Sequence, residues 1–300
     1  MRALVTGGKG FVGKWLVEHL RDSGDEVVVI DKETDVANAQ EIGPAIVNAA
    51  PDVVYHLAAL SHVGESWDSP SEVLRVNVLG TAEVLAATRR SGGDTKVIVI
   101  SSAEVYGSIA PEMLPVDETA PVAPVTPYAA SKAAAEQVAL QAWRGYGQPV
   151  VVARPFNHVG PGQAPSFAVS ALSRRIVEAA LSGAPTIAVG TLSTRRDFTD
   201  VRDVVRAYRG LAEVGAPGEI YNVCSGRDVA ILDIAEALLK LSSADLKLVT
   251  DESLVRPVDV PVLCGDPTRI SELAGWKPEI PLEETLRDVI SYWRDHVAGR

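Results

Sequence analysis

The chain lacks the features that mark membrane proteins, secreted proteins and metal sites. No apolar run reaches the roughly 18 residues that a membrane span needs, and the first residues run directly into a strand and a glycine turn. We therefore expect neither a membrane span nor a signal peptide. Only two cysteines occur, Cys224 and Cys264, and their spacing is not that of a metal site. These absences predict a reduced, cytoplasmic protein with no bound metal.

The charge balance argues against a nucleic-acid-binding protein. The net charge is −11, and no lysine or arginine run is long enough to overcome repulsion by a phosphate backbone. We therefore expect no nucleic-acid partner. A small anionic ligand remains compatible with this charge because it needs only a few local donors.

Short apolar runs alternate with amphipathic segments through the first half of the chain. The runs are rich in valine and isoleucine and read as buried strands over residues 2–6, 26–30, 52–57, 96–101 and 149–153. Amphipathic segments such as 11–23 lie between them. This alternation predicts an α/β protein, with a doubly wound parallel sheet of the Rossmann type covered by helices on both faces.

The alternation loosens after Arg154, where segments rich in proline, glycine and arginine interrupt the helices. We expect residues 1–154, with about 197–223 returning to the main sheet, to form a dinucleotide-binding domain. Residues 155–196 and 224–300 would form a smaller, discontinuous region on the substrate side, over the carboxyl ends of the strands.

A glycine turn, TGGKGFVG (6–13), lies between the first expected strand and the first helix. Gly7 would permit the tight turn, Gly10 would let the backbone approach a pyrophosphate, and Gly13 would allow close packing of helix on strand. The phosphates would then lie at the positive end of the helix. A glycine triplet alone is weak evidence, but its place between strand and helix makes it much stronger.

Asp31 ends the second expected strand, about 20 residues past the turn, where a carboxylate can accept hydrogen bonds from the adenosine ribose. It would repel a 2′-phosphate, which favours NAD(H) over NADP(H), although Lys9 and Lys32 would soften that preference. The alternative is an ordinary solvent-exposed aspartate.

Tyr128 and Lys132 stand four residues apart in an expected helix over 127–142, so both side chains lie on one face. A nearby ammonium would stabilise the phenolate and make Tyr128 a usable acid–base catalyst. Ser102 follows the strand that ends at 101, and it would donate a hydrogen bond to a reacting carbonyl oxygen. The alternative is that Tyr128 and Lys132 are an ordinary exposed pair on a surface helix, and their spacing alone would favour it. The glycine turn and the strand that ends before Ser102 favour the catalytic interpretation instead.

Four motifs together carry a family resemblance: TGGKGFVG, HLAA (56–59), SSAEVYG (101–107) and PYAASK (127–132). The chain resembles, over essentially its whole length, the extended short-chain dehydrogenases/reductases of the NAD-dependent epimerase/dehydratase family, which modify nucleotide sugars. The resemblance implies that Ser102, Tyr128 and Lys132 are catalytic. It also implies cofactor contacts from Gly7, Gly10, Phe11, Val12, Gly13, Asp31, Asp35, Val36, Leu57, Ala58, Ala59, Asn77, Tyr128, Lys132 and Pro155.

Further segments are similar to GDP-mannose 4,6-dehydratases and the reductases related to them, among them LAALSHVGESW (57–67), RPFNHVGPGQ (154–163) and RRDFTDVRD (195–203). This likeness implies a nucleotide-diphosphate sugar as partner, with a GDP-sugar favoured. It places Ser61 and His62 near the sugar. Asn157, Arg196 and Arg256 would bind the nucleotide diphosphate, and Arg174 or Arg175 would add a phosphate contact. For each arginine the alternative is a surface salt bridge.

Glu104 matches the glutamate with which sugar 4,6-dehydratases of this family remove the C5 proton. Many of them carry an acid or a hydroxyl just before it, where this chain has Ala103, and in relatives that only reduce, the glutamate would merely orient the sugar. The link between Asp31 and the next helix is also short, as in reductases of the group. The resemblance therefore favours NAD(P)H-dependent reduction of the C4 keto group of a GDP-4-keto-6-deoxysugar. The alternative is a redox-neutral dehydratase or C4 epimerase that retains its NAD.

Two expected helices, over 72–91 and 131–146, carry small apolar residues on their faces. As in relatives, pairing of these helices between subunits would make a four-helix contact, so we expect a homodimer. Packing within one subunit is the alternative.

Overall fold

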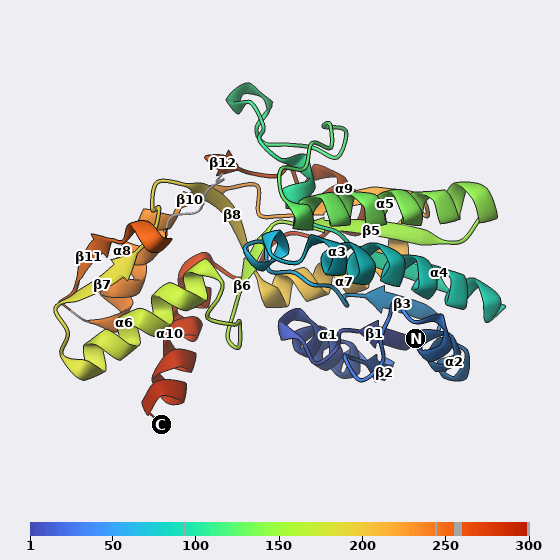
Figure 1. The fold of residues 1–300 in the computed structure, drawn as a ribbon, viewed down its shortest axis with the longest axis horizontal. Helices are drawn as coiled ribbons and strands as arrows, with labels where there is room; N and C mark the ends of the chain where they lie inside the picture. The colour runs from blue at the N-terminus through green and yellow to red at the C-terminus, as the bar shows by residue number, and fades with distance from the viewer. Residues whose placement is uncertain (93, 244, 255–259, 299–300) are drawn as a thin grey trace.

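The computed structural model describes residues 1–92, 94–243, 245–254 and 260–298. Figure 1 shows a larger lobe built mainly from the first half of the chain and a smaller lobe built mainly from the second half. The C-terminal helix belongs to the smaller lobe, and the N-terminus lies in the sheet of the larger one.

A six-stranded parallel sheet forms the centre of the larger lobe. Its strands follow the spatial order β2–β1–β3–β4–β5–β9, which is the doubly wound arrangement expected from the sequence. They are β1 (Arg2–Thr6), β2 (Glu26–Ile30), β3 (Val53–His56), β4 (Lys96–Ile100), β5 (Val150–Pro155) and β9 (Ile220–Val223). Because all six run parallel, their carboxyl ends meet at one edge, and the site residues gather there.

Helices cover both faces of this sheet. One face carries α1 (Phe11–Asp22), α7 (Val201–Val214) and α9 (Thr268–Ala274), and the other carries α2 (Ala39–Ala49), α4 (Gly80–Arg90) and α5 (Pro127–Tyr146). The short helix α3 (Pro70–Leu74) and the π-helical turn η2 (Arg75–Leu79) run directly into α4. Side chains alternate between the two cores along each strand, as the period of a buried parallel strand requires.

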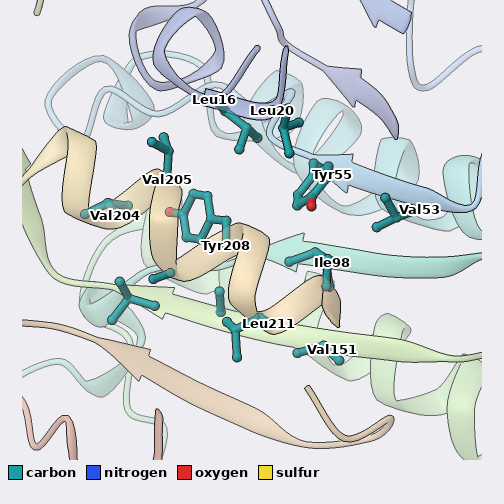
Figure 2. Close-up of a cluster of buried hydrophobic side chains, with 14 of the residues drawn as sticks. Leu16, Leu20, Val53, Tyr55, Ile98, Val151, Val204, Val205, Tyr208 and Leu211 are labelled. Carbon is teal, nitrogen blue, oxygen red and sulfur yellow. The ribbon is translucent and has the colours of Figure 1, made fainter. Parts of the chain in front are cut away.

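The core between the sheet and α7 is shown in Figure 2. Leu211 and Tyr208 of α7 and Leu16 of α1 are fully buried against strand residues such as Tyr55 and Ile98. Interdigitated aliphatic side chains of this kind supply most of the free energy that holds a helix on a sheet.

The smaller lobe packs three helices against short strands. Its helices are α6 (Ala168–Ser182), α8 (Ile231–Ser242) and α10 (Leu282–Ala298). Its strands are β6 (Asn157–Val159), β7 (Thr186–Val189), β8 (Arg195–Asp200), β10 (Asp228–Ala230), β11 (Lys247–Thr250) and β12 (Val262–Leu263). Single helical turns lie in the connections: η1 (Glu65–Trp67), η3 (Ala103–Tyr106), η4 (Pro111–Met113) and η5 (Glu252–Leu254).

The chain crosses between the lobes at different points from those the sequence indicated. Strand β8 pairs with β6, β10 and β12 in the smaller lobe, and the return to the main sheet begins with α7. Residues 268–276, expected in the smaller region, instead pack on the larger lobe, where Ile270 and Trp276 join the core beneath α7. Helix α9 is short and follows a proline-rich stretch, so its periodicity gives little information about which core it joins.

Across the described ranges, none of the helices combines the length and the apolar character needed to cross a bilayer.

Leu211→Ala should lower the free energy of unfolding by about 2–5 kcal/mol, because it removes buried methyl groups and leaves a cavity between α7 and the sheet. Urea denaturation followed by circular dichroism measures this loss. Leu181→Ala is the matched control: Leu181 is 62% exposed on α6, and its truncation should change stability by less than about 0.5 kcal/mol. Equal losses in the two variants would contradict the assignment of this core.

Candidate active site

The glycine turn has the geometry of a pyrophosphate site. Gly7 has a φ of +72° and donates its N–H to the carbonyl of Ile30 at 2.7 Å, which ties the turn to β2. A Cβ at Gly13 would lie 2.2 Å from the carbonyl oxygen of Gly7, so only glycine lets α1 approach this closely. A Cβ at Gly10 would meet, among the described residues beyond its chain neighbours, only that same carbonyl oxygen within 4 Å, so the outer side of Gly10 is open to a ligand.

The N-terminus of α1 completes this site. The helix begins at Phe11 after an N-cap at Gly10, and no side chain of the described residues caps it. The N–H groups of its first turn, which include those of Phe11 and Val12, therefore point toward the turn with the positive end of the helix dipole. This arrangement fits the two phosphates of a nicotinamide dinucleotide.

The end of β3 lies directly beside the turn. A Cβ on Gly7 would lie 2.9 Å from the amide nitrogen of Ala58, and that amide donates to Oγ1 of Thr6 at 3.2 Å. Leu57 donates its N–H to the carbonyl of Thr6 at 3.2 Å. The Leu57–Ala59 segment, from which the sequence predicts cofactor contacts, thus starts beside the glycine turn.

Asn77 connects this segment to helix α5. Its side-chain oxygen accepts the N–H of Leu60 at 2.8 Å, and its amide donates to Oγ of Ser131 at 2.8 Å. Ser131 in turn donates to the carbonyl of Tyr128 at 2.7 Å. Asn77 is buried, and its bonds hold the backbone of Leu60 and the side chain of Ser131 in place. Sequence reasoning did not identify Ser131, although its position between Tyr128 and Lys132 is a usable signal.

Asp31 holds the loop at the expected ribose position. One carboxylate oxygen accepts the N–H of Lys9 at 2.7 Å and the other accepts the N–H of Lys32 at 2.9 Å. The carboxylate therefore connects the glycine turn to the end of β2. Each oxygen has a further lone pair with which to accept a ribose hydroxyl.

Asp35 and Val36 lie at the start of the short link to α2. Asp35 forms an ion pair with Arg75 at 2.7 Å, and a bond from the Ala37 N–H contributes most to lowering the pKa of its carboxyl. Val36 is buried and packs against Gly80, where a Cβ would lie 2.8 Å from its side chain. Asp35 thus has an ion-pair partner that the sequence had not indicated, while Val36 forms part of the wall beside η2 and α4.

The three expected catalytic groups meet at the carboxyl end of β4. Ser102 follows the strand directly, and its hydroxyl forms a hydrogen bond with the phenol of Tyr128 that lowers the pKa of the phenol. Tyr128 lies in the first turn of α5, where Pro127 and the Thr126 cap begin the helix. Lys132 lies one turn later and donates from Nζ to the carbonyl of Ile100 at 2.8 Å.

The electrostatics of this cluster differ from the sequence expectation that the ammonium makes the phenol acidic. Burial raises the pKa of Tyr128 to about 12, with Glu104 adding to the rise, and it lowers the pKa of Lys132 to about 8. Removal from water is the largest cause of both shifts, because burial penalises whichever form of a group carries charge.

Glu104 lies in η3, directly beyond Ser102. Its N–H donates to Oγ of Ser102 at 3.2 Å, and its charge acts on the phenol of Tyr128. The carboxylate therefore belongs to the same cluster as the three expected catalytic groups. Ala103 beside it is buried in an apolar cluster with Phe156 and Leu263, which explains why no polar side chain stands at that position.

The substrate side begins where β5 ends. Pro155 is buried at the end of β5, and Asn157 is exposed at the start of β6. Two ring contacts join the lobes here: His158 stacks on Phe11 at 6.2 Å between centroids, and His62 meets Phe167 edge-on at 6.0 Å. Sequence reasoning placed His62 near the sugar but missed Phe167. Ser61 immediately precedes His62 in the same loop.

The structure describes two of the three arginines expected at the nucleotide diphosphate. Arg196 on β8 is 9% exposed and donates to the carbonyl of Arg195 at 2.9 Å, among other contacts. Arg174 pairs with Glu178 at 2.7 Å and lies over the ring of Trp293. A phosphate contact from Arg174 would require exchange of this ion pair. Arg256 lies outside the described residues.

Gly13→Ala should abolish binding of nicotinamide dinucleotides, because its Cβ would displace the turn from the helix N-terminus. Gly43→Ala is the matched control: Gly43 lies within α2, where a Cβ would meet nothing closer than 3.7 Å. Isothermal titration calorimetry with NADH and NADPH compares the two. Unchanged affinity in Gly13→Ala, with the variant folded, would contradict the turn's role.

Comparisons with known proteins identify the family of the chain. Residues 32–289 match the family model described as GDP-mannose 4,6 dehydratase. The chain is 36% identical to the GDP-6-deoxy-D-mannose reductase of Pseudomonas aeruginosa, covering 99% of this chain and 98% of that protein. It is 33% identical to a dTDP-glucose 4,6-dehydratase of Streptomyces niveus, over 99% of this chain and 94% of the relative.

Solved structures show the same fold across the whole chain. The Pseudomonas aeruginosa protein RMD, complexed with NADPH, superposes with a TM-score of 0.90 at 35% identity, covering 99% of this chain and all of that one. A UDP-glucose 4-epimerase of Thermotoga maritima with UDP-glucose gives a TM-score of 0.92 at 27% identity, with the same coverage. The chain therefore belongs to the GDP-mannose 4,6-dehydratase family, within the extended NAD(P)-dependent short-chain dehydrogenases/reductases.

Proposed function

We propose that the protein reduces the C4 keto group of a nucleotide-diphosphate 4-keto-6-deoxysugar with NAD(P)H, and that its substrate is GDP-4-dehydro-6-deoxy-D-mannose, which gives GDP-D-rhamnose. The observation that carries this proposal is the meeting of Ser102, Tyr128 and Lys132 at the end of β4, beside a turn shaped for a dinucleotide. The full-length similarity to a GDP-6-deoxy-D-mannose reductase supports the choice of sugar.

Three residues of the chain have separate roles at the carbonyl group of the substrate. A reduced nicotinamide, when bound, supplies the hydride for the carbonyl carbon. Ser102 accepts the N–H of Glu104, and its own proton, which faces the phenol of Tyr128, would be donated to the carbonyl oxygen once the substrate is bound. Tyr128 donates its phenolic proton to that oxygen as negative charge develops there. Lys132, fixed on the Ile100 carbonyl, holds its ammonium beside this site.

The raised pKa of Tyr128 suits the proton donor that the proposed reduction needs. A phenol with a pKa of about 12 carries its proton at neutral pH and is ready to donate it. A dehydratase or an epimerase starts by oxidising the sugar, and that step needs a base to accept the hydroxyl proton. The short link from Asp31 to α2, which begins at Ala39, points the same way, because a less enclosed adenosine end suits a cofactor that is exchanged at every turnover.

We propose that the nucleotide diphosphate binds on the smaller lobe, with Asn157, Arg174, Arg196 and Arg256 as its donors and Ser61 and His62 beside the sugar. The exposure of Asn157 on β6 supports this position, as does the His62–Phe167 contact across the lobes. Binding energy from this distant end would position C4 against the cofactor.

The carboxylate of Asp31 favours NADH over NADPH in this proposal, because a 2′-phosphate would approach a negative charge. Lys9 and Lys32 stand next to it and reduce the difference. Lys9 forms an ion pair with Glu33 that a 2′-phosphate would compete for.

A redox-neutral 4,6-dehydratase is the second candidate, and Glu104 favours it by lying beside Tyr128 and Ser102. In that reaction the carboxylate would remove the C5 proton. In the reduction, Glu104 orients the sugar instead.

Purified protein should oxidise NADH or NADPH stoichiometrically with GDP-4-dehydro-6-deoxy-D-mannose, and it should not convert GDP-mannose without added reductant. A panel of nucleotide 4-ketosugars, assayed at the nicotinamide absorbance band and by chromatography of the sugar, measures both. Conversion of GDP-mannose without reductant would establish the dehydratase instead.

Tyr128→Phe should lower kcat by at least about 10²-fold, the contribution of a positioned general acid, while cofactor affinity stays within about twofold. The reason is that the phenyl ring keeps the packing of a buried residue and removes only the proton donor. Tyr146→Phe is the control, since Tyr146 is exposed near the end of the same helix. Activity retained in Tyr128→Phe would exclude the role given to Tyr128.

We also propose a cytoplasmic homodimer. The two cysteines are free, buried thiols, which suits a reducing compartment. Helices α4 and α5 present half-buried alanines, and Leu74 and Leu79 are exposed just before α4.

Light scattering coupled to size exclusion should give twice the chain mass, and Leu79→Glu should shift it toward the monomer because it places charge on this apolar face. Leu181→Glu, exposed on the smaller lobe, should leave the mass unchanged; a wild-type monomer would refute the dimer.

A further inference from the structure

A fully buried ion pair lies beneath the catalytic cluster. Glu136 of α5 and Arg154 of β5 pair at 2.7 Å between Oε2 and the guanidinium, and a second bond runs from Nε to Oε1 at 2.9 Å. Their side chains are 0% and 3% exposed. Burying two charges costs several kcal/mol each, and well-packed apolar residues of similar size often give equal or greater stability. Stability alone therefore accounts poorly for this pair.

Glu136 reaches the strand end that carries the catalytic serine. Ser101, the residue before Ser102, donates its hydroxyl to Oε1 of Glu136. The residue before that, Ile100, accepts the ammonium of Lys132 at 2.8 Å. Two consecutive residues at the end of β4 are thus held by two residues of α5 that stand one helical turn apart, on the same face as Tyr128.

Arg154 extends the connection to the other side of the site. Its Nη1 donates to the phenol of Tyr106 at 3.0 Å, and Tyr106 donates to Asn222 at 2.7 Å. Tyr106 is part of η3, the turn that also carries Glu104. The same ion pair therefore contacts α5, the end of β4 and η3, which supply all four groups of the cluster.

We propose that Glu136 is a positioning residue of this active site: its carboxylate, held by Arg154 and Ser101, fixes Ser102 against the helix of Tyr128 and keeps a negative charge one helical turn from Lys132. This inference rests on the proposed reduction for its kinetic consequence, but the state of Lys132 itself can be measured without substrate.

The charges around Lys132 give the direction of the effect. Burial lowers its pKa to about 8, and the negative charge of Glu136 opposes this fall. From β3, His56 faces Lys132 but stays neutral, since burial lowers the pKa of His56 to about 3. Tyr128 is neutral below about pH 12, and Arg154 on β5 acts through Glu136. Without the carboxylate, the positive Arg154 remains and the pKa of Lys132 falls.

Glu136→Gln tests the proposal directly. Because the reduction requires protonated Lys132, activity is lost as the pH rises through the pKa of Lys132. In the variant this alkaline limb of kcat should move down by about one pH unit, which is about a tenfold loss of kcat above it, while KM changes less than about twofold. Carbon-13 NMR of lysine labelled at Cε, with the Lys132 signal assigned from Lys132→Arg, should show the same downward shift in the free protein.

Two further variants separate positioning from packing. Glu136→Leu combined with Arg154→Met removes the pair without leaving a buried charge unpaired, so it should fold at least as stably. If the pair is merely structural, this variant has a wild-type pH profile. The proposal expects instead that the alkaline limb of kcat lies at lower pH in this variant, as in Glu136→Gln. Ser101→Ala keeps the carboxylate, so it should lower kcat without moving the titration of Lys132.

The two proposals fail in different ways. If the wild-type protein reduces no nucleotide 4-ketosugar, the proposed function is refuted, and the NMR titration still decides the role of Glu136. If the Lys132 titration is the same in wild type and Glu136→Gln, the positioning role is overturned whatever the substrate proves to be.

Discussion

One hydrogen bond organises the reacting end of the molecule: Lys132 donates its ammonium proton to the carbonyl of Ile100 at 2.8 Å. It joins the catalytic helix to the end of the central strand β4, and so brings the Tyr128 phenol to the Ser102 hydroxyl. The ammonium is buried, so this bond compensates for part of its lost hydration. The Lys132 ammonium therefore both joins α5 to β4 and supplies a positive charge beside the reacting carbonyl. The charges around it must keep it protonated for both roles.

The first half of the chain could be predicted from sequence because its signals are local. Valine-rich runs located β1 and β2 to the residue, and the Gly7–Gly13 spacing identified a turn whose close approach only glycine allows. The four-residue spacing of Tyr128 and Lys132 placed both on one face of α5. In each case the feature depends on neighbours within one or two turns of the chain, so the sequence contains what is needed.

What could not be predicted depends on partners far apart in the chain. Residues 268–276 pack on the larger lobe because Trp276 donates to the carbonyl of Asp203 at 3.0 Å, a contact 73 positions away. The rise in the pKa of Tyr128 follows from how completely the folded chain buries it. Glu136 gave a faint signal, as an acid one turn beyond Lys132, and Arg154 gave another, as a cation ending an apolar strand. Their pairing is visible only once the sheet is assembled.

The two ends of the cofactor path differ in how they respond to protons. Beneath the glycine turn, His56 is held between Thr6 at 2.8 Å and Thr81 at 3.1 Å, and with a pKa of about 3 it keeps one charge state across the physiological range. The glycine turn thus rests on an imidazole whose charge mild acidification leaves unchanged. His56 can therefore serve as a fixed hydrogen-bonding link between β1, β3 and α4 over that range.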